Sequence, residues 1–272
     1  MLSIVKGPYL QIPTETSMTM MWETSELASA KVEVYQAERK HGGSGGNYLP
    51  PEKVITTASN GEYSLIHQIT VQQLEPGTTY FYTVFSENET GALQDGPHPF
   101  KTAPGKDVPF SFTVTSETGG FHFADKTDGQ INRDIFMLMG KYRPDLSLFA
   151  GDIVDDGREY ADWSTYFFEP GRAFLKTTPF YSCLGNHEEN ADWFYKFFAY
   201  PNPKNYYSFD YGDAHFTCLD STAFVGNEQY PGLSHELTPG NAQIDFLIRD
   251  LQASAAKWKI VFFHYSPYVS GG

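Results

Sequence analysis

The chain has 272 residues, which is enough for one large domain or two of ordinary size. Hydrophobic residues make up 40% and aromatic residues 16% of the chain, so it can bury sizeable cores and does not belong to the disordered class. Its formal net charge of −14 disfavours nucleic acid and anionic membrane surfaces as partners, although bound metal cations would still permit a phosphate-bearing substrate.

Cysteine content and targeting signals add little that is specific. Cys183 and Cys218 both lie in apolar, strand-like runs, and we expect two buried free thiols in preference to a disulfide. No apolar stretch approaches the length of a membrane span, and Lys6 and Pro8 interrupt the apolar run that a signal peptide would need. We therefore expect the chain as given to be soluble.

The first hundred residues show the two-residue periodicity of β-strands. The stretches "SMTMMWET" (17–24), "SAKVEVYQ" (29–36) and "HQITVQQL" (67–74) alternate apolar and polar residues, with turn residues between them. In "LEPGTTYFYTVFS" (74–86) a Pro-Gly turn leads into a strand with alternating aromatic residues, which resembles the fibronectin type III sandwich. We expect an all-β sandwich over residues 1–104, and "FKTAPGKDVP" (100–109) is predicted to be the linker to the next domain.

From Phe110 the pattern changes to strands alternating with helices, which is typical of a layered α/β domain. Buried strands are predicted in "FSFTVT" (110–115), "DLSLFAGD" (145–152), "PFYSCLGN" (179–186) and "KIVFF" (259–263), and a hairpin in "YYSFDYGDAHFTCLD" (206–220). Helical stripes are predicted along Ile131, Ile135, Leu138, Met139 and Tyr142, and along Ile244, Leu247, Ile248 and Leu251.

Polar side chains follow four of the predicted strands. Glu117 follows the first strand, Asp152 the second, Asn186 and His187 the third, and His264 the last. Ligands of open α/β sheets bind beyond the carboxyl ends of the strands, and oxygen-rich sites with some imidazole suit ions such as Mn, Fe or Zn. Each residue alone could have an ordinary structural role, such as a capped turn or a backbone-bonded histidine, and their common placement is what favours a metal site.

At this point the sequence resembles a known family. "GDIVDDG" (151–157), "GNHE" (185–188) and a later strand-borne histidine look like the calcineurin-like metallophosphoesterases, and the preceding sandwich narrows the resemblance to the purple acid phosphatase-like branch. The resemblance covers essentially the whole chain. It implies hydrolysis of phosphomonoesters, with diesters as a second class, at a centre of two metal ions drawn from Fe, Mn and Zn.

The resemblance also implies roles for individual residues. Asp152 would bridge the two metals, and Glu117 would bind the first metal. Asn186 and His264 would bind the second metal. His187 would be the histidine that contacts phosphate or protonates the leaving group.

Three departures from the family pattern bear on these expectations. Glu117 stands where the family has Asp, and Asp155 stands where the purple enzymes have a tyrosine ligand, which leaves Asp155 with either a metal role or that of a loop acid. The family's "GHxH" motif does not occur in the chain, so the resemblance implies that the second domain, residues 108–272, is incomplete at its C-terminal end. The alternative is a catalytically impaired relative that binds a phosphate ligand or a partner. Export to a secreted or periplasmic location is implied by the resemblance alone.

Overall fold

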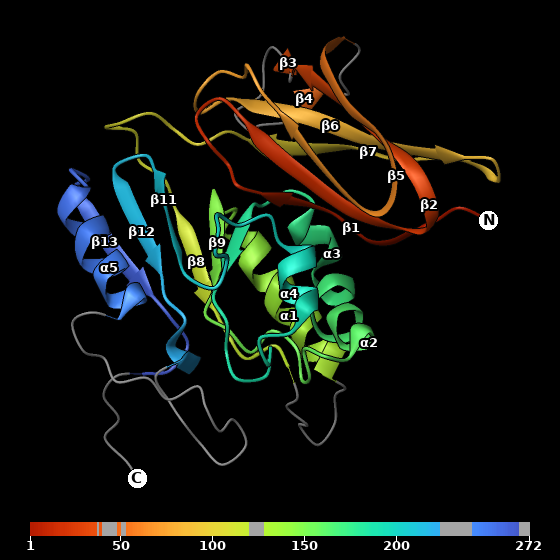
Figure 1. Cartoon of the computed structure of the whole chain (residues 1–272). Helices are drawn as coiled ribbons and strands as arrows, with labels where there is room; N and C mark the ends of the chain where they lie inside the picture. The colour runs from red at the N-terminus through yellow and green to blue at the C-terminus, as the bar shows by residue number, and fades with distance from the viewer. Residues whose placement is uncertain (37, 40–47, 50–52, 120–127, 224–240, 267–272) are drawn as a thin grey trace.

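The computed structural model describes residues 1–36, 38–39, 48–49, 53–119, 128–223 and 241–266 (Figure 1). Strands fill the N-terminal part, and an α/β part follows it. Among the described residues, no helix combines the length and apolar character needed to cross a bilayer.

The N-terminal strands form an antiparallel sheet centred on one long strand, β2. The sheet runs in the order β1-β2-β6-β7, and β5 also pairs with β2. The two alternating stretches expected at residues 17–24 and 29–36 are the two ends of β2, with a shift in its pairing to β5 between Glu23 and Ala28. The strands are β1 (Ile4–Gln11), β2 (Met18–Gln36), β5 (Val54–Val71), β6 (Thr79–Asn88) and β7 (Gly91–Lys101), with a short hairpin of β3 (Glu38–Arg39) and β4 (Tyr48–Leu49).

Alternation explains which face of these strands is buried. In the second half of β2, Ala30, Val32 and Val34 are buried while their neighbours are partly exposed, as period-two patterning requires. The predicted linker begins later than expected, because β7 continues to Lys101. A fibronectin type III topology for this part stays a prediction.

Within its described residues, the α/β part contains two three-stranded sheets. One is parallel, in the order β10-β9-β8, and the other runs β11-β12-β13. The predicted hairpin is confirmed as β11 and β12, joined at Gly212 and Asp213. The strands are β8 (Phe112–Thr115), β9 (Leu146–Phe149), β10 (Phe180–Ser182), β11 (Tyr207–Tyr211), β12 (Ala214–Cys218) and β13 (Trp258–Phe262).

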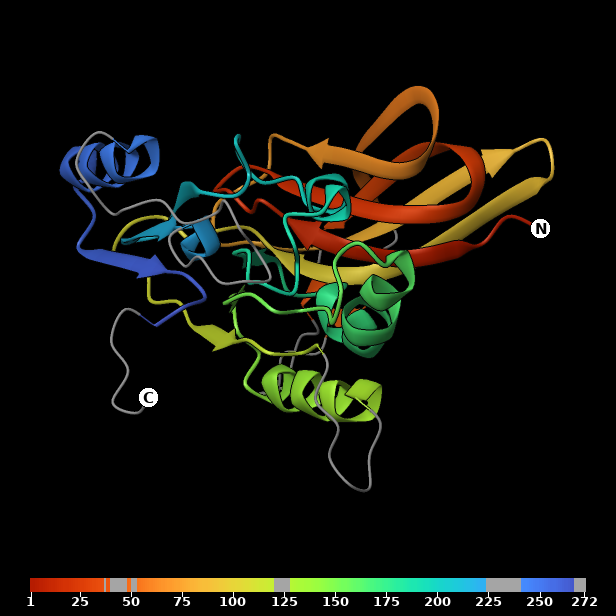
Figure 2. The ribbon, with the colours of Figure 1, turned by 60° about the horizontal axis from the view of Figure 1, so that its bottom comes forward.

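Five α-helices accompany these sheets in the described residues. They are α1 (Asp128–Lys141), α2 (Tyr160–Asp162), α3 (Glu169–Leu175), α4 (Asp192–Phe197) and α5 (Ala242–Ala253), with a π-helical segment Trp163–Phe168 joining α2 to α3 and a short 3-10 turn Ser221–Ala223. Figure 2 shows α5 and β13, in blue, at one end of the α/β part and the green helices at the other.

The predicted apolar stripe of α1 was partly wrong. Leu138 and Tyr142 are exposed, whereas Phe136 and Met139 are buried. The ring of Phe136 packs against those of Phe149, Phe167 and Phe174, which sets the buried face of the helix. Apolar residues surround most of this helix, so periodicity alone did not identify that face. In α5 likewise, Ile248 of the predicted stripe is exposed.

One hydrophobic cluster joins the two parts of the chain. Tyr9, Met21 and Ala103 belong to the same buried cluster as the strands and helices of the α/β part. Two hydrogen bonds from side chains of β1 to backbone carbonyls of the α/β part add to this contact. The Tyr9 hydroxyl donates to the Phe197 carbonyl at 2.6 Å, and the Gln11 side-chain amide donates to the Phe180 carbonyl at 3.1 Å. Cys183 lies in this cluster too, and it and Cys218 are free and buried, as expected.

Candidate metal centre

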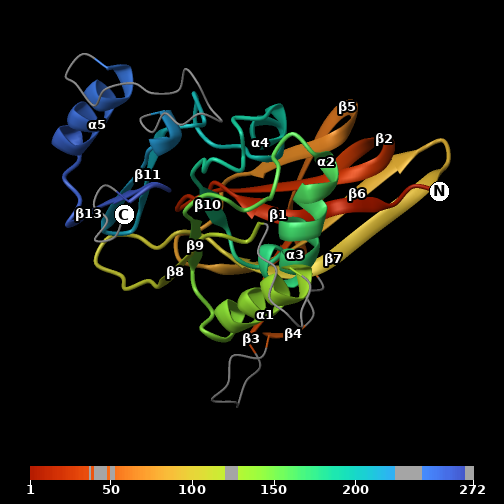
Figure 3. The same ribbon diagram turned by 90° about the horizontal axis from the view of Figure 1, so that it is seen from below.

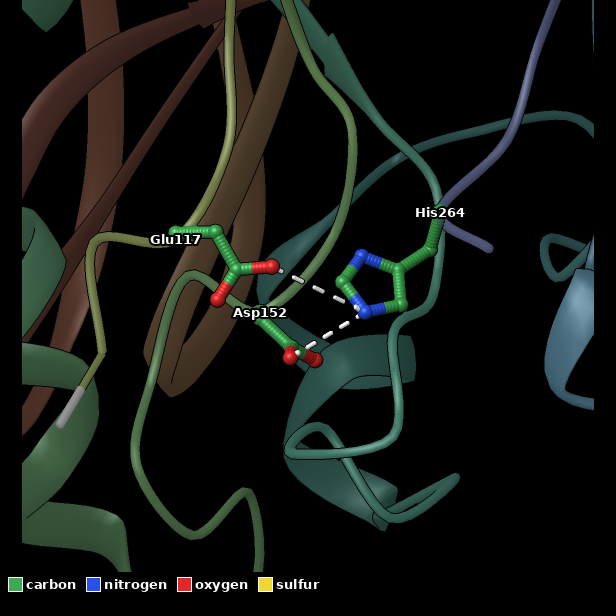
Figure 4. A group of neighbouring side chains, drawn as sticks. All are labelled: Glu117, Asp152 and His264. Atoms are coloured by element: carbon green, nitrogen blue, oxygen red, sulfur yellow. Dashed lines mark ion pairs between the residues drawn. The ribbon is translucent and has the colours of Figure 1, made fainter. Parts of the chain in front are cut away.

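The predicted polar residues lie at one edge of the molecule because of the strand directions. β8, β9 and β10 are parallel neighbours, so their carboxyl ends meet at the same edge. Glu117 follows β8, Asp152 follows β9 and Asn186 follows β10. His264 reaches the same place from β13 of the other sheet, as Figure 4 shows.

Three of the other four predicted ligands lie around the Nε2 atom of His264, and Asp155 does not. This atom lies 3.1 Å from Asp152 Oδ2, 3.2 Å from Asn186 Oδ1 and 3.9 Å from Glu117 Oε1. One ligand atom from each of Glu117, Asp152 and His264 falls within 4.8 Å of the others (Figure 4). The donor set of two carboxylates, an amide oxygen and an imidazole suits a hard or borderline cation, so the residues fit the metal that the strand-end pattern predicts.

The imidazole of His264 is held in one orientation. Its Nδ1 lies 2.8 Å from the carbonyl oxygen of Ala150, which can only accept, so Nδ1 carries a proton. This arrangement leaves Nε2 to face the carboxylates, as in metal-binding histidines whose second nitrogen is held by a backbone carbonyl. Burial disfavours the charged ring, but the hydrogen bond and the charge of Asp152 outweigh it and raise the pKa of His264 to about 9.

Glu117 is the most exposed of these four residues. Its side chain is 43% exposed, while that of Asp152 is only 6% exposed. Partial burial, followed by the nearby Asp152 charge, raises the pKa of Glu117. The carboxylates of Glu117 and Asp152 repel each other, and a cation bound between them would relieve that repulsion.

The backbone around the site is in an unusual conformation. Asp152 has a φ of 52° and Glu117 a φ of 58°, in the left-handed region that non-glycine residues seldom occupy. At Gly185 a Cβ atom would lie 2.1 Å from Asp152 Oδ1, so only glycine allows the two loops to approach this closely. Strain of this kind concentrates at functional sites.

Glu188 was not assigned a site role from the sequence, yet it links the two loops of the centre. Its carboxylate is fully buried and accepts backbone N–H bonds from Asp152 at 2.9 Å, Ile153 at 2.7 Å and Gly185 at 2.5 Å. Burial and the neighbouring Asp152 charge raise the pKa of Glu188 to about 7. The signal available in the sequence was a charged residue directly beside the motif, with nothing to say which backbone groups it would meet.

His187 and Asp155 form a separate pair beside the centre. His187 Nδ1 lies 2.5 Å from the carbonyl oxygen of Asp155 and 3.6 Å from its Oδ1. The backbone N–H of His187 donates to Asp152 Oδ1 at 2.9 Å, which ties the pair to the centre. Burial lowers the pKa of His187, but the Asp155 carbonyl and the surrounding carboxylates raise it overall. Asp155 does not belong to the group of Glu117, Asp152 and His264, so its metal role stays a prediction.

Comparison with known proteins decides the family. A model described as calcineurin-like phosphoesterase matches residues 110–272, which is more than half of the chain. The chain belongs to the calcineurin-like phosphoesterase family. A second model, the purple acid phosphatase N-terminal domain, matches residues 5–102. The resemblance noted from the sequence is thereby confirmed, including its purple acid phosphatase branch.

Solved structures add a fold-level likeness. The purple acid phosphatase PPD1 from yellow lupin (Lupinus luteus) seeds matches with a TM-score of 0.68 and 16% identity, over 94% of this chain and 50% of that one. The chain therefore spans about half the length of the lupin enzyme. No curated protein sequence matches it.

Two further structures match smaller shares of the chain. The sensor domain of the anti-sigma factor RsgI4 of Pseudobacteroides cellulosolvens has 19% identity and a TM-score of 0.26, over 41% of this chain and 98% of that one. A human fibronectin type-III domain has 23% identity and a TM-score of 0.23, over 38% of this chain and 85% of that one. Scores this low support no argument about fold.

Proposed function

We propose that this phosphoesterase hydrolyses small-molecule phosphate monoesters, with diesters as a second substrate class, at a centre of two metal ions drawn from Fe, Mn and Zn. The observation that carries the proposal is the convergence of Glu117, Asp152 and Asn186 on the Nε2 atom of His264. We assign Asp152 as the bridging ligand, Glu117 to the first metal, and Asn186 and His264 to the second, with Asp155 as a further candidate ligand.

The residues of the chain would divide the work of hydrolysis. When bound, the metal ions would supply positive charge and Lewis acidity at the phosphoryl group. Asp152 and His264 would hold that charge in place, since one is buried and the other is fixed by the Ala150 carbonyl. His187 would serve the leaving group: its Nδ1 is engaged by Asp155, so Nε2 is the atom available to donate a proton.

A second candidate is a relative with impaired catalysis that binds a phosphate ligand or a partner. The observation favouring it is Glu117, whose side chain is 43% exposed and lies 3.9 Å from His264 Nε2, further than Asp152. The two candidates differ in one measurable respect, namely turnover.

The test is hydrolysis of p-nitrophenyl phosphate by the chain supplied with Mn, or with Fe and Zn. Asp152→Asn is the sharpest variant, because Asn tolerates the left-handed backbone at this position while losing the charge. We expect activity in the parent and none in Asp152→Asn, with the exposed Asp192→Asn as a control that keeps activity. Equal activity in parent and Asp152→Asn would overturn the bridging assignment, and metal binding without turnover in the parent would favour the impaired relative.

The domain division is also a proposal. We place a fibronectin type III-like domain at residues 1–104 and the phosphoesterase domain at 108–272. Secretion or periplasmic export is proposed on the family resemblance alone, and expression of the chain's gene with cell fractionation would test it.

A further inference from the structure

A large cavity lies away from the metal centre, between the two parts of the chain. Its volume is about 970 Å³, and it is lined by residues of β7, α1, α3 and the segments that follow those helices. Figure 3 shows α1 and α3 side by side. Binding sites for small molecules are commonly found at such interfaces and have volumes in this range.

The base of the cavity is apolar. Phe100 of β7, Phe136 of α1 and Phe174 of α3 line it, and all three are buried. Four prolines complete this wall, namely Pro99, Pro144, Pro170 and Pro179. The surface is therefore shaped to contact the aromatic or aliphatic body of a ligand.

The charges around the cavity have the opposite sign to those of the whole protein. Three of the six arginines in the chain line it together with two lysines: Lys101, Arg133, Arg143, Arg172 and Lys176. The acidic residues beside them are Asp145 and Glu169 in the lining and Asp95, which pairs with Lys176. Basic residues thus exceed acidic ones by two here, in a chain whose net charge is −14.

Both lysines are neutralised by ion pairs, whereas two of the arginines have no ion pair among the described residues. Lys101 Nζ lies 2.8 Å from Asp145 Oδ1, and Lys176 Nζ lies 2.8 Å from Asp95 Oδ2. Arg172 is only loosely paired, at 3.9 Å from the same Asp95 oxygen. Within the part of the chain that the structure describes, the guanidinium groups of Arg133 and Arg143 make no ion pair or hydrogen bond. Their donors are available to an acceptor that comes from outside.

We propose that this cavity binds a small amphipathic anion, in which one carboxylate, sulfonate or phosphate group is joined to an aromatic or aliphatic body. Arg133 and Arg143 would take the anionic group, and the phenylalanine wall would take the body. A planar guanidinium matches such oxyanions with two parallel hydrogen bonds. A polyanion is disfavoured, because the acidic remainder of the protein would repel its other charges. The site is independent of the proposed catalysis.

The probe for this site is anilinonaphthalene sulfonate, a fluorescent aromatic anion, with decanoate as competitor. We expect saturable binding to the parent chain that decanoate displaces. The double variant Arg133→Gln, Arg143→Gln should bind about tenfold more weakly, since it loses charge-assisted hydrogen bonds. Arg249→Gln, an exposed arginine on α5, is the matched control and should bind as the parent does.

Two further variants test whether the probe occupies this cavity. Gly140 lines the cavity, and a Cβ there would sit 3.7 Å from the Phe174 ring, which is ordinary van der Waals contact. The larger side chain of Gly140→Leu should therefore take up cavity space and weaken probe binding. Asp152→Asn should leave probe binding unchanged. The proposal is overturned if the parent shows no saturable binding, if the double arginine variant binds as tightly as the parent, or if Asp152→Asn abolishes binding and so places the probe in the metal centre.

Discussion

The carboxylate of Glu188 accepts the backbone N–H of Asp152 at 2.9 Å, so a residue of one loop holds the backbone of the residue that we propose as the bridging ligand. The same carboxylate accepts the N–H groups of Ile153 and Gly185. One buried group thus fixes the spacing between the loops that follow β9 and β10.

Replacing Glu188 by Gln should therefore disturb the centre without removing a ligand. A glutamine places an NH₂ group against N–H donors, and each buried donor left without an acceptor costs about 1 to 3 kcal/mol. We expect a lower midpoint of thermal unfolding and weaker Mn binding by calorimetry. Asp192→Asn, on the exposed surface of α4, is the control. Unchanged stability and Mn affinity in Glu188→Gln would contradict the positioning role.

The sequence could predict which residues lie together at the candidate site, but it could not predict their backbone conformation or their hydrogen-bond partners. Polar residues after apolar runs identified Glu117, Asp152, Asn186 and His264, because parallel strands bring their carboxyl ends together. The left-handed backbone at Glu117 and Asp152 could not be predicted, since both residues usually avoid it and only the packed loops impose it. The partners of Glu188 were equally hidden, because they are backbone groups with no sequence signature.

For the fold too, local patterns were predictable from the sequence and long-range contacts were not. Alternating patterns located the strands, but the joining of residues 18–36 into one β2 strand depends on long-range pairing with β5 and β6. The buried face of α1 depends on the rings that surround Phe136, which lie in β9 and in the continuous stretch formed by the π-helical segment and α3.

Substitutions of Lys6 and Glu23, which form a buried ion pair, should have non-additive effects on the free energy of unfolding. In this pair Nζ lies 2.8 Å from Oε2, and the ammonium lies 3.4 Å from the centre of the Tyr160 ring. Lys6→Met would leave the Glu23 carboxylate buried without its cationic partner, at a cost of about 3 to 5 kcal/mol. Adding Glu23→Leu should recover most of that loss. Chemical denaturation of the parent, both single variants and the double variant measures the coupling. Additive losses would show that the pair is not a unit.

His67 should make the protein less stable in acid. Its side chain is fully buried with its ring nitrogens bonded to Thr24 and Ser64, and burial lowers its pKa to about 4. Between pH 6.5 and about 4 the unfolded chain binds a proton that the folded chain does not, so stability falls as the pH falls, by up to about 3 kcal/mol. Urea denaturation at pH 7 and pH 5 should show a smaller loss in His67→Gln than in the parent. Equal losses would assign the acid sensitivity to other groups.

His215 should affect the pH dependence of stability in the opposite direction to His67, making the protein more stable at low pH than at high pH. Its two ring nitrogens lie 2.7 Å from Asp210 Oδ1 and 2.9 Å from Asp250 Oδ2. Burial disfavours the charged ring, but the hydrogen bonds and charges of Asp250 and Asp210 outweigh it and raise the pKa of His215.

Because the folded form binds the proton more tightly, this stabilisation is complete below the unfolded pKa and is lost as the pH rises through the folded value. Nuclear magnetic resonance titration of the His215 ring should give a pKa above that of an unfolded peptide, and Asp250→Asn should lower it. A pKa at or below the peptide value would contradict the inference that Asp210 and Asp250 together stabilise the charged His215 ring.

The most direct test of the proposed centre is anomalous diffraction from a crystal of the Mn-loaded chain. We predict a Mn peak in contact with Asp152 Oδ2 and His264 Nε2, and no peak at that position in Asp152→Asn. A Mn-loaded crystal with no peak beside these two atoms, or with the same peak in the variant, would contradict the assignment of the metal centre.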